Sequence, residues 1–69
     1  MNVYVFKTSI SQKDIRMVNR TLRTLITTGR WNFDLEDVDN ILRIESLDNI
    51  AESVCYHLGM DGFYCEELE

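Results

Sequence analysis

Two cysteines are the residues best suited to chemistry in this chain of 69 residues. Cys55 and Cys65 stand ten positions apart, and the one histidine, His57, lies between them. Thiolates bind soft metal ions and can be oxidised to a disulfide, but this spacing matches no known metal-binding motif. In a reducing compartment such residues are typically small buried hydrophobic groups. The two interpretations are therefore core packing, or a soft-metal or redox site, with His57 as a surface helix residue.

The rest of the sequence contains no pattern typical of an enzyme. It has no nucleophile beside a plausible base, no glycine-rich phosphate loop and no histidine pair at helical spacing. The acidic run "DLEDVDN" lacks the central glycine and distal glutamate of a calcium loop. We interpret Asp34, Glu36, Asp37 and Asp39 as hairpin charges that discourage edge-to-edge pairing, with divalent-cation binding as the alternative. We therefore expect that the protein is not an enzyme and binds no cofactor.

Length and charge restrict the class of protein further. The chain is long enough for one domain, residues 1–69, near the lower limit for a fold without disulfides or metals. Its net charge of −5 disfavours nucleic-acid binding, which requires a positive surface. The apolar runs are too short to span a bilayer, and the N-terminus lacks the features of a signal peptide. We expect a cytoplasmic protein that binds neither nucleic acid nor membrane.

The periodicity of apolar residues predicts four strands and two helices. Residues 3–6, 31–37, 41–46 and 63–68 have strand patterns, and residues 12–26 and 47–58 have apolar residues at helical intervals. The order βαββαβ predicts an α+β, ferredoxin-like sandwich, with a four-stranded antiparallel sheet and two helices on one face. Right-handed crossovers would place the first and third strands in the centre and the second and fourth at the edges.

The ends and inward faces of these elements follow from individual residues. Gly29 and Gly59 suit the left-handed position beyond the end of each helix, and Ser46 or Asp48 can cap the second helix. The core expected from the strands comprises Val3, Val5, Trp31, Phe33, Leu35, Leu42 and Ile44. The core expected from the helices comprises Ile15, Val18, Leu22, Leu25, Ile26, Leu47, Ile50, Ala51, Val54 and Leu58.

The whole pattern resembles a heavy-metal-associated domain, the fold of small copper chaperones and of N-terminal modules of metal-pumping ATPases. The likeness runs from "VYVF" to "GFYCEEL" and rests on the element order, the helix "IRMVNRTLRTLI", the strand "FDLED" and a second helix that ends before "GMDGF". In that family a Cys-x-x-Cys motif at the start of the first helix binds the metal. The corresponding positions here are Ser11 and Asp14.

A hydroxyl and a carboxylate cannot replace thiolates as Cu(I) ligands. Ser11 and Asp14 instead have the spacing of a capping box, which stabilises a helix by about 1 kcal/mol. The resemblance therefore implies the fold of the family without its metal-transfer activity.

Two surfaces are candidates for binding a protein. A basic stripe, comprising Lys13, Arg16, Arg20 and Arg23, recurs along the first helix at steps of three and four residues. It is either an ordinary solvated face or a docking site for an acidic partner, such as the acidic hairpin of a second copy.

The second surface is the uncovered face of the sheet. Strand alternation predicts that it exposes Tyr4, Phe6, Ile41 and Tyr64, which would form an apolar patch. RNA-binding domains of this topology stack bases on such aromatics, but nearby carboxylates and the missing aromatic–glycine signature disfavour that use here. We therefore expect an interaction module that binds an unknown protein or itself, with simple partial exposure of the patch as the alternative. A metal-handling protein that uses one of its cysteines is the alternative function.

Overall fold

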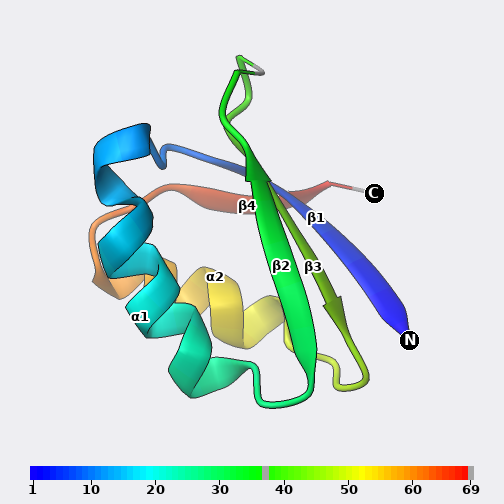
Figure 1. Cartoon of the computed structure of the whole chain (residues 1–69). Coiled ribbons are helices and arrows are strands. Elements are labelled where there is room, and N and C mark those ends of the chain that lie inside the picture. The colour runs from blue at the N-terminus through cyan, green and yellow to red at the C-terminus, as the bar shows by residue number, and fades with distance from the viewer. Residues whose placement is uncertain (37, 69) are drawn as a thin grey trace.

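The computed structural model describes residues 1–36 and 38–68. Its elements are β1 (Asn2–Thr8), a 3-10 turn η1 (Gln12–Asp14), α1 (Ile15–Leu25), β2 (Gly29–Asp34), β3 (Ile41–Ser46), α2 (Ala51–Met60) and β4 (Cys65–Leu68) (Figure 1). The predicted α+β class, with a four-stranded antiparallel sheet and two helices, is confirmed. The order along the chain includes η1, a separate turn between β1 and α1 that the sequence pattern did not distinguish from the helix.

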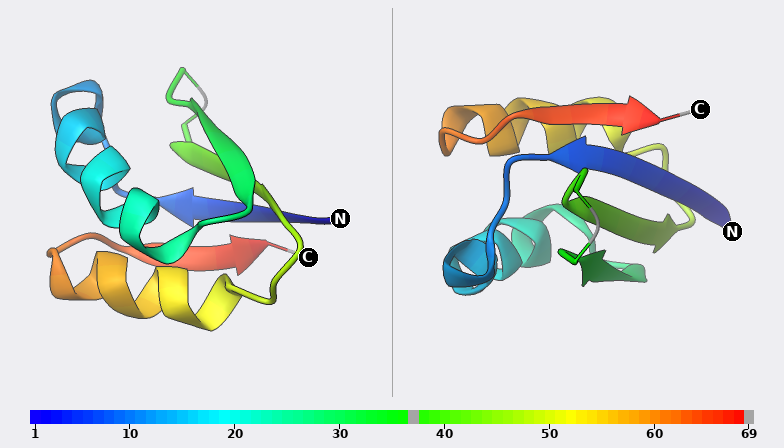
Figure 2. Two further views of the ribbon diagram at one scale, coloured as in Figure 1. Left: turned by 60° about the horizontal axis from the view of Figure 1, so that its bottom comes forward. Right: turned by 90° about the horizontal axis from the view of Figure 1, so that it is seen from above.

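The strands lie in the order β2–β3–β1–β4, and each neighbouring pair is antiparallel. The first and third strands are therefore central and the second and fourth are edges, as predicted. Both helices pack on one face of this sheet, with α2 running beside β4 (Figures 1 and 2). The opposite face of the sheet carries no helix, and the arrangement is compatible with a ferredoxin-like fold. Neither helix has the length and apolar character needed to cross a lipid bilayer, and the described residues contain no other candidate.

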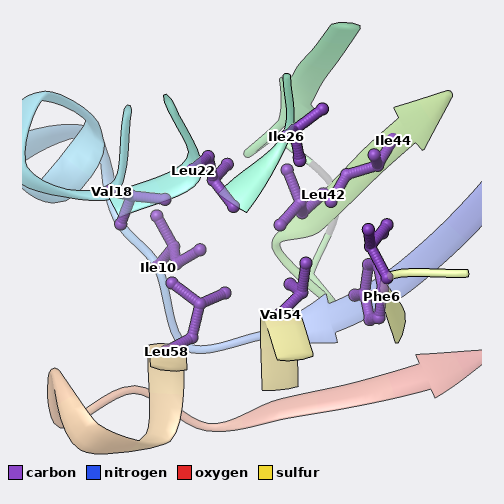
Figure 3. Packing of buried hydrophobic residues seen from close by; sticks show 10 residues of the cluster. Phe6, Ile10, Val18, Leu22, Ile26, Leu42, Ile44, Val54 and Leu58 are labelled. Carbon is purple, nitrogen blue, oxygen red and sulfur yellow. The ribbon is translucent and has the colours of Figure 1, made fainter. Parts of the chain in front are cut away.

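One apolar core lies between the helices and the sheet. Figure 3 shows side chains from both helices converging on Phe6 of β1 and on Leu42 and Ile44 of β3. The completely buried apolar residues are Phe6, Ile10, Val18, Leu22, Leu42, Ile44, Val54 and Leu58. Each such side chain contributes about 1.5–3 kcal/mol when it leaves water. The predicted helix stripes and the inward face of β3 supply most of these residues, and Trp31 and Phe33 of β2 pack against them while only partly buried.

The predicted faces of β1 are wrong. Phe6 is buried in the core and Tyr4 packs against it, whereas Val3 is 61% exposed. Phe6 lies opposite Leu42 in the sheet, while Val3 lies opposite Glu45. Paired residues of neighbouring strands point to the same face, so the register with β3 decides which side of β1 is buried. Burying the two aromatic rings also removes more apolar area from water than burying two valines.

Gly29 does not end a helix in the left-handed conformation, as the sequence suggested. Helix α1 ends at Leu25, and Ile26 is already extended, with φ −112° and ψ 100°. Gly29 instead begins β2, where a Cβ atom would overlap the backbone carbonyl oxygen of Glu45 on β3. The glycine is therefore needed for the close approach of two strands.

The predicted start of the second helix is also wrong. Helix α2 begins at Ala51 after Ile50, and no side chain caps it. Ser46 is buried at the end of β3, where its Oγ accepts a hydrogen bond from the Asp48 backbone N–H at 3.1 Å. Leu47, expected on the buried helix face, is exposed and precedes the helix. Ser46 therefore stabilises the turn before α2 and does not cap the helix.

Helix α2 ends at a different glycine from the one predicted. Gly59 lies inside α2, and Gly62 has the positive φ of 94°. The Gly62 N–H donates to the Gly59 oxygen at 3.0 Å, and the Phe63 N–H donates to the Leu58 oxygen at 2.9 Å. These two bonds form a Schellman motif, which requires a residue that tolerates the left-handed region. The motif turns the chain from α2 directly towards β4.

Candidate functional site

The two cysteines lie in contact. Cys55 is on α2 and Cys65 opens β4, and the Schellman motif between them folds β4 back along the helix. Their Sγ atoms are 3.3 Å apart, and both residues are half-buried free thiols. One S–H group donates to the other sulfur atom. The fold therefore brings the two cysteines into contact, although their spacing in the sequence matches no known metal-binding motif.

The surroundings of this pair weaken its reactivity. Burial, the hydrogen bond to Cys55 and the proximity of that second thiol all raise the pKa of Cys65 well above its ordinary value. A thiol with a raised pKa stays protonated at neutral pH, and the protonated form is a poor nucleophile and metal ligand. No group of three or more His, Cys, Asp or Glu side chains suited to hold a metal occurs within residues 1–36 and 38–68. The Nδ1 atom of His57 lies 2.8 Å from the backbone oxygen of Ser53, in its own helix.

A groove separates α1 from the edge strand β2. Its volume is about 600 Å³, within the range of about 300–1,000 Å³ that is usual for ligand sites. Apolar and polar side chains share its lining. The apolar ones are Ile15, Trp31, Phe33 and Leu35, and the polar ones are Gln12, Asn19, Asn32, Asp34 and Glu36. The Trp31 Nε1–H donates to Asn19 Oδ1 at 2.8 Å, which fixes the indole ring against α1.

Sequence analysis missed this groove. The alternation of Trp31, Phe33 and Leu35 indicated a buried face, and the second strand was expected at an edge of the sheet. The polar Asn19, one position from the apolar stripe of α1, was the available signal that the helix and the strand are not fully packed together there.

The bare face of the sheet is less aromatic than predicted. The register places Val3, Val5, Ile41 and Leu68 on this face or at its margin. Tyr64, which precedes β4, lies near Lys7 and Glu66 of the same face. Tyr64 is 53% exposed, as predicted, whereas Ile41 is on the predicted face but only 6% exposed. Tyr4 and Phe6 belong to the covered face. The apolar patch therefore consists mainly of aliphatic side chains and one tyrosine.

Charged residues surround this patch and affect Tyr64. The register places Lys7 of β1 opposite Glu66 of β4, and Arg43 of β3 opposite Val5. Lys7 also forms an ion pair with Asp39 at 3.5 Å. Partial burial and the neighbouring Glu66 carboxylate raise the pKa of Tyr64. The patch therefore has an apolar centre and a border with charges of both signs.

The predicted capping box is confirmed. The Ser11 backbone N–H and its Oγ–H both donate to Asp14 Oδ2, at 2.9 and 2.8 Å. These hydrogen bonds, with a smaller effect of the Lys13 charge, lower the pKa of Asp14. The box caps η1, the turn that leads into α1. Ser11 and Asp14 are therefore engaged with each other.

The basic stripe lies on the outer side of α1. Its four residues, Lys13, Arg16, Arg20 and Arg23, are all exposed. None of them forms an ion pair with any residue that the structure describes. The exposed stripe lies on the side of α1 away from its buried residues Val18 and Leu22, and α1 covers one face of the sheet, so the stripe and the bare face point to opposite sides of the molecule. A single flat partner cannot contact both surfaces at once.

The predicted acidic hairpin is only partly described. Glu36 is exposed, Asp34 is half-buried at the end of β2, and Asp39 pairs with Lys7. Asp37 lies outside the described residues.

No family model, curated protein or solved structure matches the chain. The function is therefore inferred from the geometry of these surfaces.

Proposed function

We propose that the protein is a non-enzymatic interaction module of the cytoplasm, with a ferredoxin-like fold shaped like a heavy-metal-associated domain. It binds a protein partner, or a second copy of itself, through the bare face of its sheet, and it binds neither nucleic acid nor membrane. The observation that supports this function is an apolar patch, which includes the exposed Val3 and Tyr64, on a sheet face that no helix covers.

The composition of the bare face suits protein contact. Protein interfaces combine an apolar centre with a polar border, and an exposed apolar patch on a small domain marks such a site. Here Lys7, Arg43 and Glu45 supply border charges of both signs. Mixed charges set the orientation of a protein partner, whereas the phosphate backbone of a nucleic acid requires a uniformly positive surface.

The test replaces one residue of the patch and compares it with an exposed tyrosine elsewhere. Tyr64→Asp introduces a charge into the bare face, and Tyr56→Asp introduces the same charge on the exposed surface of α2. Affinity capture from the native cell, followed by quantification of each captured protein, should show partners that Tyr64→Asp loses and Tyr56→Asp retains. The proposal fails if Tyr64→Asp captures the same proteins as the wild type and self-associates no more weakly than the wild type.

A second candidate function is the handling of a soft metal ion by Cys55 and Cys65. It is favoured by the 3.3 Å distance between their Sγ atoms, because thiolates are the preferred ligands of Cu(I). Titration with Cu(I) and Zn(II) under reducing conditions, against a competing chelator, separates the two functions. Tight stoichiometric binding that Cys55→Ser abolishes would establish the metal function, whereas the interaction module predicts no tight binding.

A further inference from the structure

The two edges of the sheet differ in how well they are protected against pairing with another strand. An edge strand presents unpaired backbone N–H and C=O groups, and proteins usually block such edges with charges, prolines or bulges. The β4 edge carries Glu66 and Glu67 and no cation. In every central antiparallel register of two β4 strands, a glutamate lies opposite a glutamate, which is repulsive. The β4 edge is therefore protected.

The β2 edge has the opposite property, because its charges are self-complementary. Arg30 and Asp34 stand at equal distances on either side of Asn32, and β2 contains no proline. If two β2 strands pair antiparallel with Asn32 opposite Asn32, then Arg30 of each copy lies opposite Asp34 of the other. Opposite charges directly across an antiparallel pair are stabilising.

We propose that two copies of this chain associate by antiparallel pairing of their β2 strands, centred on Asn32. The pairing joins the two sheets into one continuous sheet and keeps the helices of both copies on the same side. It uses the edge of the sheet and not its bare face, so it does not depend on the function proposed above.

The groove between α1 and β2 supports this register. Pairing about Asn32 places Trp31 of the second copy opposite Phe33, on the covered face of the sheet. Phe33, Leu35 and Ile15 line the groove at this position. Each indole can keep its hydrogen bond to Asn19 of its own copy and pack against Phe33 of the other copy across the strand pair. Aromatic pairs between Trp31 and Phe33 on the covered face and two flanking charge pairs on the bare face are complementary features of one interface.

The charges needed for this pairing are accessible in the single chain. The Arg30 side chain is 80% exposed, and its Nε–H donates to Glu45 Oε2 at 3.2 Å. A guanidinium has five donors, so Arg30 can retain Glu45 and also contact Asp34 of a second copy. Asp34 has no ion-pair partner in the described part of the chain. The net charge of −5 opposes association only weakly at physiological salt, where the screening length is about 8 Å.

Charge reversal gives a test in which two defective chains rescue each other. In a dimer of Arg30→Asp, each introduced aspartate faces the native Asp34 of the other copy, so both pairs are repulsive. In a dimer of Asp34→Arg, each introduced arginine faces the native Arg30 of the other copy, which is also repulsive. We expect each variant alone to self-associate at least about tenfold more weakly than the wild type in sedimentation equilibrium. An equimolar mixture should form mixed dimers, detected by native mass spectrometry. In such a dimer the two introduced side chains face each other as an ion pair, and the native Asp34 of one copy faces the native Arg30 of the other.

Glu52→Arg is the matched control for Asp34→Arg, because it makes the same charge change at an exposed position of α2, which packs beside β4 at the other edge of the sheet. It should leave association unchanged. Circular dichroism checks that each variant is folded, and Arg30→Ala replaces Arg30→Asp if the reversed charge opposite Glu45 unfolds the chain. The proposal is overturned if the wild type is monomeric at all accessible concentrations, or if the mixture associates no better than either variant. Self-association that Tyr64→Asp abolishes and Arg30→Asp leaves intact would also overturn it and would assign the contact to the bare face.

Discussion

Replacing Phe6 with alanine tests which face of β1 is buried, the point on which sequence and structure disagree. The Phe6 side chain is completely buried in the core. Its removal therefore loses the full transfer free energy of the ring and leaves a cavity, at a cost of about 3–5 kcal/mol. At about 0.05–0.15 kcal/mol per residue, a chain of 69 residues has a total stability of about 3.5–10 kcal/mol. The substitution should thus remove about 30% or more of that stability.

The assay is urea denaturation followed by circular dichroism and by the fluorescence of Trp31. Val3→Ala is the matched control, because Val3 lies on the same strand and is 61% exposed. We expect it to change the free energy of unfolding by no more than about 0.5 kcal/mol. If Phe6→Ala is too unstable to measure, Phe6→Leu keeps most of the apolar volume and should cost about 1–1.5 kcal/mol.

The comparison of these two positions can refute the structural assignment. A cost above about 2 kcal/mol for Val3→Ala, together with a cost below about 1 kcal/mol for Phe6→Ala, would mean that the valine face of β1 is the buried one. The register between β1 and β3 would then be shifted by one residue, since such a shift exchanges the two faces of a strand.

Three further predictions concern the glycines and two titrating side chains. Gly29→Ala should destabilise the fold by about 1–3 kcal/mol in urea denaturation, because the added Cβ atom overlaps the Glu45 backbone oxygen. Gly59→Ala should instead stabilise the fold by about 0.5–1 kcal/mol, since this position is helical and has open space around it. The lowered pKa of Asp14 contributes stability that is present above the ordinary pKa of 3.8 and is lost as pH falls through the folded value. Asp14→Asn should therefore flatten the acid side of the stability–pH curve, and an unchanged curve would contradict the capping box. The raised pKa of Cys65 contributes stability that is present below the ordinary thiol pKa of 9.0 and is lost as pH rises above it, because the unfolded thiol ionises first. Cys65→Ser should reduce the loss of stability above pH 9, measured by thermal unfolding at a series of pH values.

The elements that sequence analysis predicted well have strong contrast between apolar and polar positions. The stripe of α1 and the alternation of Trp31 and Phe33 in β2 each indicate one buried face, and the structure confirms both. The box of Ser11 and Asp14 was also predictable, because both partners lie within one turn of the chain. The hairpin of β2 and β3 followed from the turn-rich residues between two strand patterns.

The features that were predicted wrongly or missed have no such local signal. Residues 3–6 are apolar at every position, so alternation alone cannot tell one face of β1 from the other. Both Gly29 and Gly59 follow a helical pattern, and only the approach of β3 and the Schellman motif at Gly62 show which glycine has which role. The groove beside β2 exists because α1 and the strand are held apart at one end, which no single segment encodes.

The sequence by itself determined the class of fold and the cap formed by Ser11 and Asp14, because these depend on residue types at short separations along the chain. Only the tertiary structure decided that Cys55 and Cys65 touch, that Phe6 is core and Val3 is surface, and that β2 is the less protected edge. Each of these outcomes depends on register and packing between segments far apart in the chain. Such contacts form only when the whole core closes, and residues within one segment do not specify them.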